Sequence, residues 1–145
     1  RENYKKYTKK YKPSMGDIVI SRVGSYGVSS YVSNEDPFCI GQNTAIINPK
    51  KIDGRFLYGC LNSELIQNQI ELEVAGSGYK SLSLADIRAL RIPVPSKSEQ
   101  EIISKSLYSV DVHIDSQVTK LHQTQSLKKS LMQDLLTGKV RVSVN

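Results

Sequence analysis

Lysines and tyrosines alternate along the first residues of this chain. Residues 1–12 hold six cationic side chains and one carboxylate, Glu2, so most of the formal net charge of +6 lies there. Cationic side chains can neutralise phosphates, and interleaved tyrosine rings can lie against sugars or bases. A solvated basic loop would have the same composition. The segment is therefore compatible with nucleic-acid contact but does not by itself indicate it.

The residue types that bind metals are few and poorly spaced for that purpose. Cys39 and Cys60 show no CxxC spacing and have no histidine near them in the sequence, which indicates ordinary thiols instead of a zinc site or a redox pair. His113 and His122 are nine residues apart on a predicted helix, too far for the i, i+4 pairing of a helical metal site. We expect this chain to bind no metal and no cofactor.

A search for catalytic motifs finds none that is complete. The chain has no GxxxxGK[ST] phosphate loop and no cofactor-binding glycine fingerprint after a strand. Residues 48–50, Asn-Pro-Lys, approach the Asn-Pro-Pro-aromatic motif of amino-methyltransferases but lack the second proline and the aromatic residue that would hold a flipped base. Glu71 and Glu73 are two apart on a predicted helix and therefore face different ways. We expect a binding protein and no enzyme.

The elements that must position these residues begin with a small sheet. β-branched residues follow a Gly-Asp turn, and a Gly/Ser turn at residues 24–27 leads to a second alternating run. This pattern predicts a hairpin over residues 17–33. Residues 44–47 predict a further strand, which ends at an Asn-Pro pair. Gln42 and Asn43 are therefore expected to lie between strands.

Helical spacing replaces this alternation from residue 53 onward. Apolar residues recur through two predicted short helices that are separated by a break near Asn62 and Ser63. A Gly/Ser loop at residues 75–80, a short turn at residues 86–90 and an extended, proline-containing exit at residues 90–95 follow. The sequence thus predicts a domain that mixes strands and helices.

A single long helix is predicted after the prolines. Two overlapping capping boxes, Ser96 with Glu99 and Ser98 with Glu101, precede it, and neither Gly nor Pro appears before Gly138. Such a helix spans about 40 residues, or about 60 Å. A narrow apolar stripe follows it and is expected to pair with another helix, because nothing else in the chain could cover it; a single helix spanning solvent is the alternative. The expected pairing residues are Ile103, Leu107, Val110, Ile114, Val118, Leu121, Leu131 and Leu135.

These signals predict an α+β fold, with a mixed α/β domain followed by one long helix that pairs in a coiled coil. The domain is expected over residues 1–95 and to be incomplete on its N-terminal side, the helix over residues 96–139 and a tail over residues 140–145. Since residue 1 is not Met and no folded element is predicted before the first strand, we expect a piece of something longer. No run approaches the roughly 20 apolar residues of a membrane span, so a cytoplasmic protein without a membrane partner is expected.

Several segments, in order along the chain, resemble the specificity subunits of type I restriction-modification enzymes. Residues 16–24 resemble the GDI-x-[IV]-SR-x-G segment of their target-recognition domains, and residues 40–43 resemble the [IV]-x-QN that follows it. Residues 76–83 are similar to the GS-x-x-K-x-[LI]-S loop. Residues 92–100 resemble the IP-x-P…EQ junction, and residues 127–139 resemble the LKK…LL-x-LLTGK close of the helical conserved region.

The resemblance covers about residues 14–139 and implies one incomplete unit of a larger arrangement. In that family each recognition domain is longer on its N-terminal side, and a complete subunit repeats the unit of domain and helix. The chain is therefore expected to be a fragment, a part of a longer polypeptide, or a half-subunit that dimerises.

The resemblance also implies a function. A specificity subunit reads one half of a bipartite DNA target and scaffolds methyltransferase and motor-nuclease subunits, without an active site of its own. The implied partners are double-stranded DNA, these two kinds of subunit, and a second specificity half or a second copy of the chain through the long helix. S-adenosylmethionine, ATP and Mg would then bind the partner subunits. Two other functions fit the same residues: a coiled-coil adaptor whose head binds nucleic acid without sequence preference, and the recognition domain of a fused methyltransferase.

The side chains expected to contact DNA lie in turns and basic segments. They are Lys9, Lys10, Arg22, Ser25, Tyr26, Gln42, Asn43, Lys50, Lys51, Ser77, Tyr79 and Lys80. Ser25, Tyr26 and the loop at residues 79–80 are candidates for reading bases, whereas Arg22 and the lysines suit phosphates. Structural roles are the alternative: Gln42 and Asn43 could satisfy backbone groups, and Asp17 could form an ion pair with Arg22.

Overall fold

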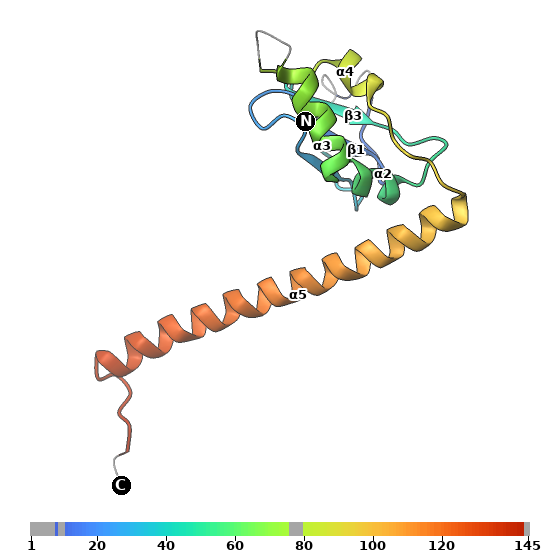
Figure 1. Ribbon diagram of the computed structural model, residues 1–145. Helices are drawn as coiled ribbons and strands as arrows, with labels where there is room; N and C mark the ends of the chain where they lie inside the picture. The colour runs from blue at the N-terminus through green and yellow to red at the C-terminus, as the bar shows by residue number, and fades with distance from the viewer. Residues whose placement is uncertain (1–7, 9–10, 76–79, 144–145) are drawn as a thin grey trace. The chain divides into compact units, whose positions relative to one another are not determined.

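The computed structural model describes residue 8, residues 11–75 and residues 80–143 (Figure 1). The chain forms two compact units, residues 1–105 and residues 106–145. The elements in chain order are β1 (Ile18–Ser21), β2 (Ser29–Tyr31), β3 (Thr44–Ile47), α2 (Gly54–Leu61), α3 (Glu64–Ala75), α4 (Leu84–Ala89) and α5 (Lys97–Leu136). The mixture of strands and helices confirms the predicted α+β class.

The three strands form one antiparallel sheet with β1 in the centre, in the order β2-β1-β3. Ile18 pairs with Tyr31 of β2 and with Ile47 of β3. The turn between β1 and β2 contains Gly27, whose φ of +82° is one that residues with a Cβ rarely adopt. The predicted hairpin over residues 17–33 and the predicted strand over residues 44–47 are both confirmed.

Helices α2 and α3 cover one face of the sheet (Figure 1). Alternate residues of β1 point toward these helices, so Ile18 and Ile20 are fully buried while Val19 is half-buried on the other face. The core that results contains Ile18, Ile20, Ala45, Leu57, Leu61, Ile66, Ile70, Val74 and Leu82. The burial of these branched side chains is the main stabilising contribution in the domain.

Capping residues in the sequence set the ends of the short helices. Asp53 is the N-cap of α2 and accepts a hydrogen bond of 2.8 Å from the backbone N–H of Phe56. Asn62 ends α2, as the predicted break between two short helices requires. The turn expected at residues 86–90 is a six-residue helix, α4, which begins at a capping box formed by Ser83 and Asp86.

The long helix is confirmed as α5, which extends over 40 residues. The Ser96 hydroxyl accepts a hydrogen bond of 3.4 Å from the backbone N–H of Glu99, as the first of the two capping boxes predicts. The second box, Ser98 with Glu101, is wrong. Ser98 already lies inside the helix, and Glu101 instead forms an exposed ion pair of 3.9 Å with Lys105.

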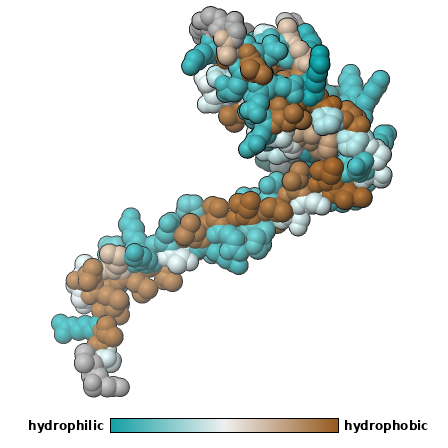
Figure 2. Space-filling model, in the orientation of Figure 1, coloured by the Kyte–Doolittle hydropathy of each residue, from teal (hydrophilic) through white to brown (hydrophobic). Residues whose placement is uncertain are grey.

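The apolar stripe of α5 is exposed among the residues that the structure describes. Figure 2 shows hydrophobic side chains along the helix, between hydrophilic ones. The eight residues expected to pair with another helix expose between 36% and 56% of their surface. Helix pairing itself stays a prediction, because one chain is described. None of the helices in the described ranges has both the length and the apolar composition needed to cross a membrane.

Candidate nucleic-acid interface

Arg22, which directly follows β1, is the point where three distant segments meet. Its backbone N–H donates a hydrogen bond of 2.7 Å to the carbonyl of Asn43, and its own carbonyl accepts one of 2.8 Å from the N–H of Leu82. The side-chain Nε of Arg22 donates a further hydrogen bond of 2.9 Å to the carbonyl of Leu82. An isolated antiparallel bridge between Val23 and Ser81 continues this pairing. The predicted contacts Arg22, Asn43 and the exposed Lys80 are thus brought to one end of the sheet.

The hairpin turn beyond Arg22 contains two predicted base-reading residues, which differ in how far they are exposed. Ser25 is exposed, whereas the ring of Tyr26 is half-buried against the core. The Tyr26 hydroxyl donates a hydrogen bond of 3.2 Å to Oε2 of Glu71, and desolvation together with this carboxylate raises the pKa of Tyr26. Tyr26 therefore packs within its own domain and would have to leave Glu71 to read a base. Ser25 needs no such change.

Gln42 and Asn43 lie in the exposed loop before β3. The backbone carbonyl of Asn43 accepts from Arg22, but neither side chain has a hydrogen-bond partner within residues 11–75 and 80–143. The turn is instead closed by Thr44, whose hydroxyl donates a hydrogen bond of 2.9 Å to the carbonyl of Gly41. Both amide side chains are therefore available to an external partner.

A buried carboxylate, which sequence reasoning considered only as a partner of Arg22, organises the neighbouring surface. Asp17 is 1% exposed and accepts hydrogen bonds from the Tyr11 hydroxyl (2.9 and 3.0 Å), the Ser14 backbone N–H (2.9 Å) and Nδ2 of Asn48 (2.6 Å). The suggested ion pair between Asp17 and Arg22 is therefore wrong. One sequence signal could have indicated this cluster: an Asp at the start of a buried strand, because a buried carboxylate needs several hydrogen-bond donors.

The ionisation of Asp17 and Tyr11 follows from these contacts. Burial raises the pKa of Asp17, but the hydrogen bonds from Asn48, Ser14 and Tyr11 outweigh it and leave the pKa below its usual value. Burial and the adjacent Asp17 carboxylate raise the pKa of Tyr11. At neutral pH, Asp17 is therefore ionised and Tyr11 is a protonated donor.

A hollow of about 370 Å³ extends along β3 and is called the β3 hollow below. Arg22, Tyr11 and Asn48 line it, together with Arg88 of α4. Sequence reasoning missed Arg88 and Asn48 as site residues, because nothing local to them indicates that they lie beside Arg22. Tyr11 belongs to the lysine- and tyrosine-rich segment that was considered for nucleic-acid contact, but its place beside Arg22 was not expected.

Lys50 and Lys51 lie at the opposite end of β3 from Asn43. Ser21 pairs with Thr44 at one end of the antiparallel pair, and Ile18 pairs with Ile47 at the other. Both lysines are exposed and line a second hollow, of about 230 Å³, together with Lys97 and Glu101. The predicted DNA contacts that lie in the described ranges thus form two groups, one at each end of the sheet.

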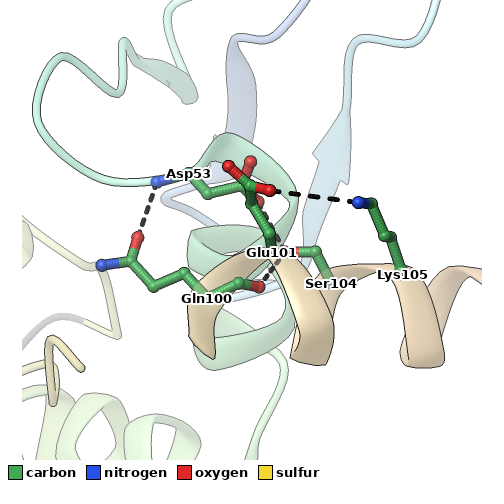
Figure 3. A network of polar contacts seen from close by, with 5 residues as sticks. All are labelled: Asp53, Gln100, Glu101, Ser104 and Lys105. Atoms are coloured by element: carbon green, nitrogen blue, oxygen red, sulfur yellow. Dashed lines mark hydrogen bonds and ion pairs between the residues drawn. The ribbon is translucent and has the colours of Figure 1, made fainter. Parts of the chain in front are cut away.

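The first turns of α5 are attached to the domain by a buried polar network (Figure 3). Oε1 of Gln100 accepts a hydrogen bond of 2.9 Å from the backbone N–H of Asp53, and Nε2 of Gln100 donates one of 2.8 Å to the carbonyl of Pro95. The Ser104 hydroxyl donates to Oδ1 of Asp53 at 2.5 Å. Gln100 and Ser104 are 2% and 6% exposed. Residues 97–105 therefore belong to the domain's compact unit, while the helix continues beyond it.

Four predicted contacts, Lys9, Lys10, Ser77 and Tyr79, lie outside the described residues. In the part of the chain that the structure describes, no three side chains of the metal-binding types come together.

Comparison with known proteins gives the family. The family model for the type I restriction modification DNA specificity domain matches residues 1–126. A protein of Methanocaldococcus jannaschii named as the MjaX type I restriction enzyme specificity subunit is 35% identical over 131 residues, which are 87% of this chain and 29% of that protein. The type I restriction enzyme MjaVIII specificity subunit of the same organism is 31% identical over 97 residues, 67% of this chain and 23% of that protein.

A third relative comes from a distant organism. The type I restriction enzyme EcoDI specificity subunit of Escherichia coli is 26% identical over 120 residues, 83% of this chain and 26% of that protein. The chain spans less than a third of the length of each of these three relatives. The relatives are specificity subunits, so the resemblance is to a recognition class and not to a catalytic one. This chain belongs to the type I restriction-modification DNA specificity domain family.

Proposed function

We propose that this chain is the part of a type I specificity subunit that reads one half of a bipartite DNA target. The observation that carries the proposal is that two features occur together in one chain. Residues far apart in sequence gather exposed polar and cationic groups at one end of the sheet, and the same domain is followed by a 40-residue helix with an uncovered apolar stripe. A recognition domain and a spacer are the two parts that such a reader needs.

Within the domain, the two kinds of side chain have different roles. Arg22, Lys50, Lys51 and Lys80 contact phosphates, which hold the domain on the duplex without reading sequence. Ser25, Gln42 and Asn43 read base edges, because they are exposed in turns and their side chains have hydrogen-bonding groups to offer. Their place around one end of β1 supports this assignment.

The long helix sets the distance to the other half of the target. Its apolar stripe pairs in a coiled coil with the helix of a second specificity half or of a second copy of this chain. A rigid pair of helices measures distance because each residue adds about 1.5 Å, so one added turn would move the reader by about 5 Å. A flexible linker of the same length would fix no distance.

The remaining functions lie on partner subunits. Methyltransferase subunits would supply S-adenosylmethionine, and motor-nuclease subunits would supply ATP and Mg, while the chain itself supplies recognition and a scaffold. This division is proposed from the family to which the chain belongs.

Methylation mapping tests the proposal. The intact gene is expressed with its neighbouring methyltransferase gene, and residues 13–95 are exchanged for the corresponding segment of a relative. We expect one half of a split methylated motif to change while the other half and the spacer stay the same. An unchanged motif with methylation intact would contradict the proposal and favour an adaptor that binds nucleic acid without sequence preference.

A further inference from the structure

The β3 hollow has the chemistry of a binding site for a sugar–phosphate backbone. We propose that it holds one stretch of the DNA backbone, with Arg22 and Arg88 on the phosphate and the apolar lining residues against the deoxyribose. The inference rests on the proposed function, since it assumes that the domain binds DNA. It adds the place where the backbone lies and a contact residue, Arg88, that no sequence motif indicates.

The charge that lines the hollow is cationic. Arg22 and Arg88 both line it, and none of its lining residues in the described ranges is a carboxylate. Asp17, which lies behind the lining residues Tyr11 and Asn48, is 1% exposed and accepts hydrogen bonds from Tyr11, Ser14 and Asn48. Neither arginine forms an ion pair with a carboxylate of the described residues. Two such guanidinium groups favour an anion, and guanidinium matches the geometry of phosphate.

Three polar side chains that line the hollow are already held by hydrogen bonds. Nε of Arg22 donates to the carbonyl of Leu82, which fixes the stem and leaves the other guanidinium N–H groups for a ligand. Tyr11 and Asn48 are both tethered by the buried Asp17, and Nδ2 of Asn48 also donates a hydrogen bond of 3.0 Å to the Tyr11 hydroxyl. Side chains that are ordered before binding lose less conformational entropy when the ligand arrives.

The apolar lining of the hollow favours a sugar beside the phosphate. Four apolar side chains from β3 and its surroundings also line the hollow: Ile40, Ala45, Ile46 and Leu84. A volume of about 370 Å³ is at the small end of the range of roughly 300–1,000 Å³ typical of ligand sites. A lining that is partly apolar and partly cationic fits a deoxyribose and its phosphate better than it fits a free anion, which would leave the apolar side chains uncovered.

The position of the hollow explains why a backbone contact there would matter. Arg22 directly follows β1, immediately before the turn that carries Ser25, and it bonds to the loop that carries Gln42 and Asn43. Phosphate contacts set the register of a protein on a duplex, and base contacts then specify the sequence. A backbone held at Arg22 and Arg88 would place the groove next to these exposed side chains.

The test compares Arg88→Ala with Arg91→Ala in the full specificity subunit assembled with its methyltransferase. Each variant removes one exposed arginine, and the two positions are three residues apart. Arg88 lines the hollow, whereas Arg91 does not. Binding is measured by fluorescence anisotropy over a range of salt concentrations. The probes are a labelled duplex containing the methylated motif and a duplex of the same length with that motif shuffled.

We expect Arg88→Ala to weaken binding to both duplexes by the same factor, about fivefold to tenfold, and to lower the slope of log K against log salt by about one. Arg91→Ala should change neither. Arg88→Lys should lose less affinity than Arg88→Ala, because lysine keeps the positive charge but lacks the planar guanidinium group that can donate two parallel hydrogen bonds.

Three results would overturn the inference. Equal affinities for Arg88→Ala and Arg91→Ala would show that the hollow does not contact DNA. A loss confined to one base position would make Arg88 a base reader, and a loss of subunit assembly with DNA binding intact would make the hollow a protein interface. Failure of the proposed function is recognised separately, since it would leave the methylated motif unchanged after the exchange of residues 13–95 whatever Arg88 does.

Discussion

Ser104 in α5 donates a hydrogen bond to the same oxygen of Asp53 that caps α2. Oδ1 of Asp53 accepts from Ser104 Oγ at 2.5 Å and from the backbone N–H of Phe56 at 2.8 Å, although Ser104 is 51 residues from Asp53. One carboxylate oxygen therefore joins the beginning of α2 to the second turn of α5. This contact makes the first turns of the long helix part of the domain.

Asp53→Ala should therefore destabilise the domain more than Ser104→Ala. The loss of an N-cap costs about 1 kcal/mol, and the loss of a buried hydrogen bond costs about 1 kcal/mol more. We expect about 2 kcal/mol for Asp53→Ala and about 1 kcal/mol for Ser104→Ala, measured by urea unfolding. Ser116→Ala, on the exposed part of α5, is the control and should change little. If the double variant is as unstable as the sum of the two single variants, Ser104 and Asp53 are not coupled.

Gly27→Ala should destabilise the domain for two independent reasons. The φ of Gly27 is +82°, and a Cβ at this position would lie 3.1 Å from Oε1 of Gln67 and 3.3 Å from Cγ2 of Ile70. Backbone strain of about 1 kcal/mol and the displacement of α3 side chains both oppose folding. We expect a loss of about 1–3 kcal/mol in the free energy of unfolding. Gly24→Ala is the matched control: its φ is also positive but nothing lies within 4 Å, so it should lose less.

The buried carboxylate of Asp17 should make stability depend on pH. Its pKa is lower in the folded protein than in the unfolded chain, so its contribution is fully present above the unfolded pKa of about 4 and is lost as pH falls through the folded pKa. Asp17→Asn should cost about 2–3 kcal/mol at neutral pH, because charged hydrogen bonds to Asn48 and Ser14 are lost.

The difference between wild type and Asp17→Asn should therefore shrink as the pH is lowered from about 6 to about 3 in urea unfolding experiments. Asp111→Asn, at an exposed position on α5, controls for the general effect of removing a carboxylate. A difference that stays constant over this range would mean that ionisation of Asp17 does not contribute to stability.

Ile114→Asp should prevent the proposed pairing of α5. Ile114 is 52% exposed, so the change should leave the fold of the domain intact, whereas a charge in the seam of a coiled coil opposes association. We expect the apparent dissociation constant to rise at least tenfold in sedimentation equilibrium. Ser116→Asp carries the same charge on the other side of the helix, because the two residues are about 200° apart.

Equal association of the two variants would contradict a seam at Ile114. A wild-type chain that stays monomeric at high concentration would instead require the partner helix to be a different specificity half.

The sequence alone determined most of the elements and several of their ends. The helix Lys97–Leu136 follows from the Ser96 cap and from the absence of Gly and Pro before Gly138. The strand Thr44–Ile47 follows from a run of four strand-like residues, Thr-Ala-Ile-Ile, that ends at an Asn-Pro pair. These signals are readable because caps, turns and apolar periodicity depend on residues that are neighbours in the chain.

Only the tertiary structure decided which side chains work together. Arg22 meets Leu82 across 60 residues, Asp17 meets Asn48 across 31, and Gln100 meets Asp53 across 47. No local pattern encodes such pairs. A buried carboxylate or guanidinium needs donors or acceptors of a suitable type, and several residues of the chain could supply them, so the choice depends on how the helices pack on the sheet. For the same reason Arg88 shares a hollow with Arg22, while Asp17, which the sequence allowed as the partner of Arg22, is buried with Tyr11 and Asn48.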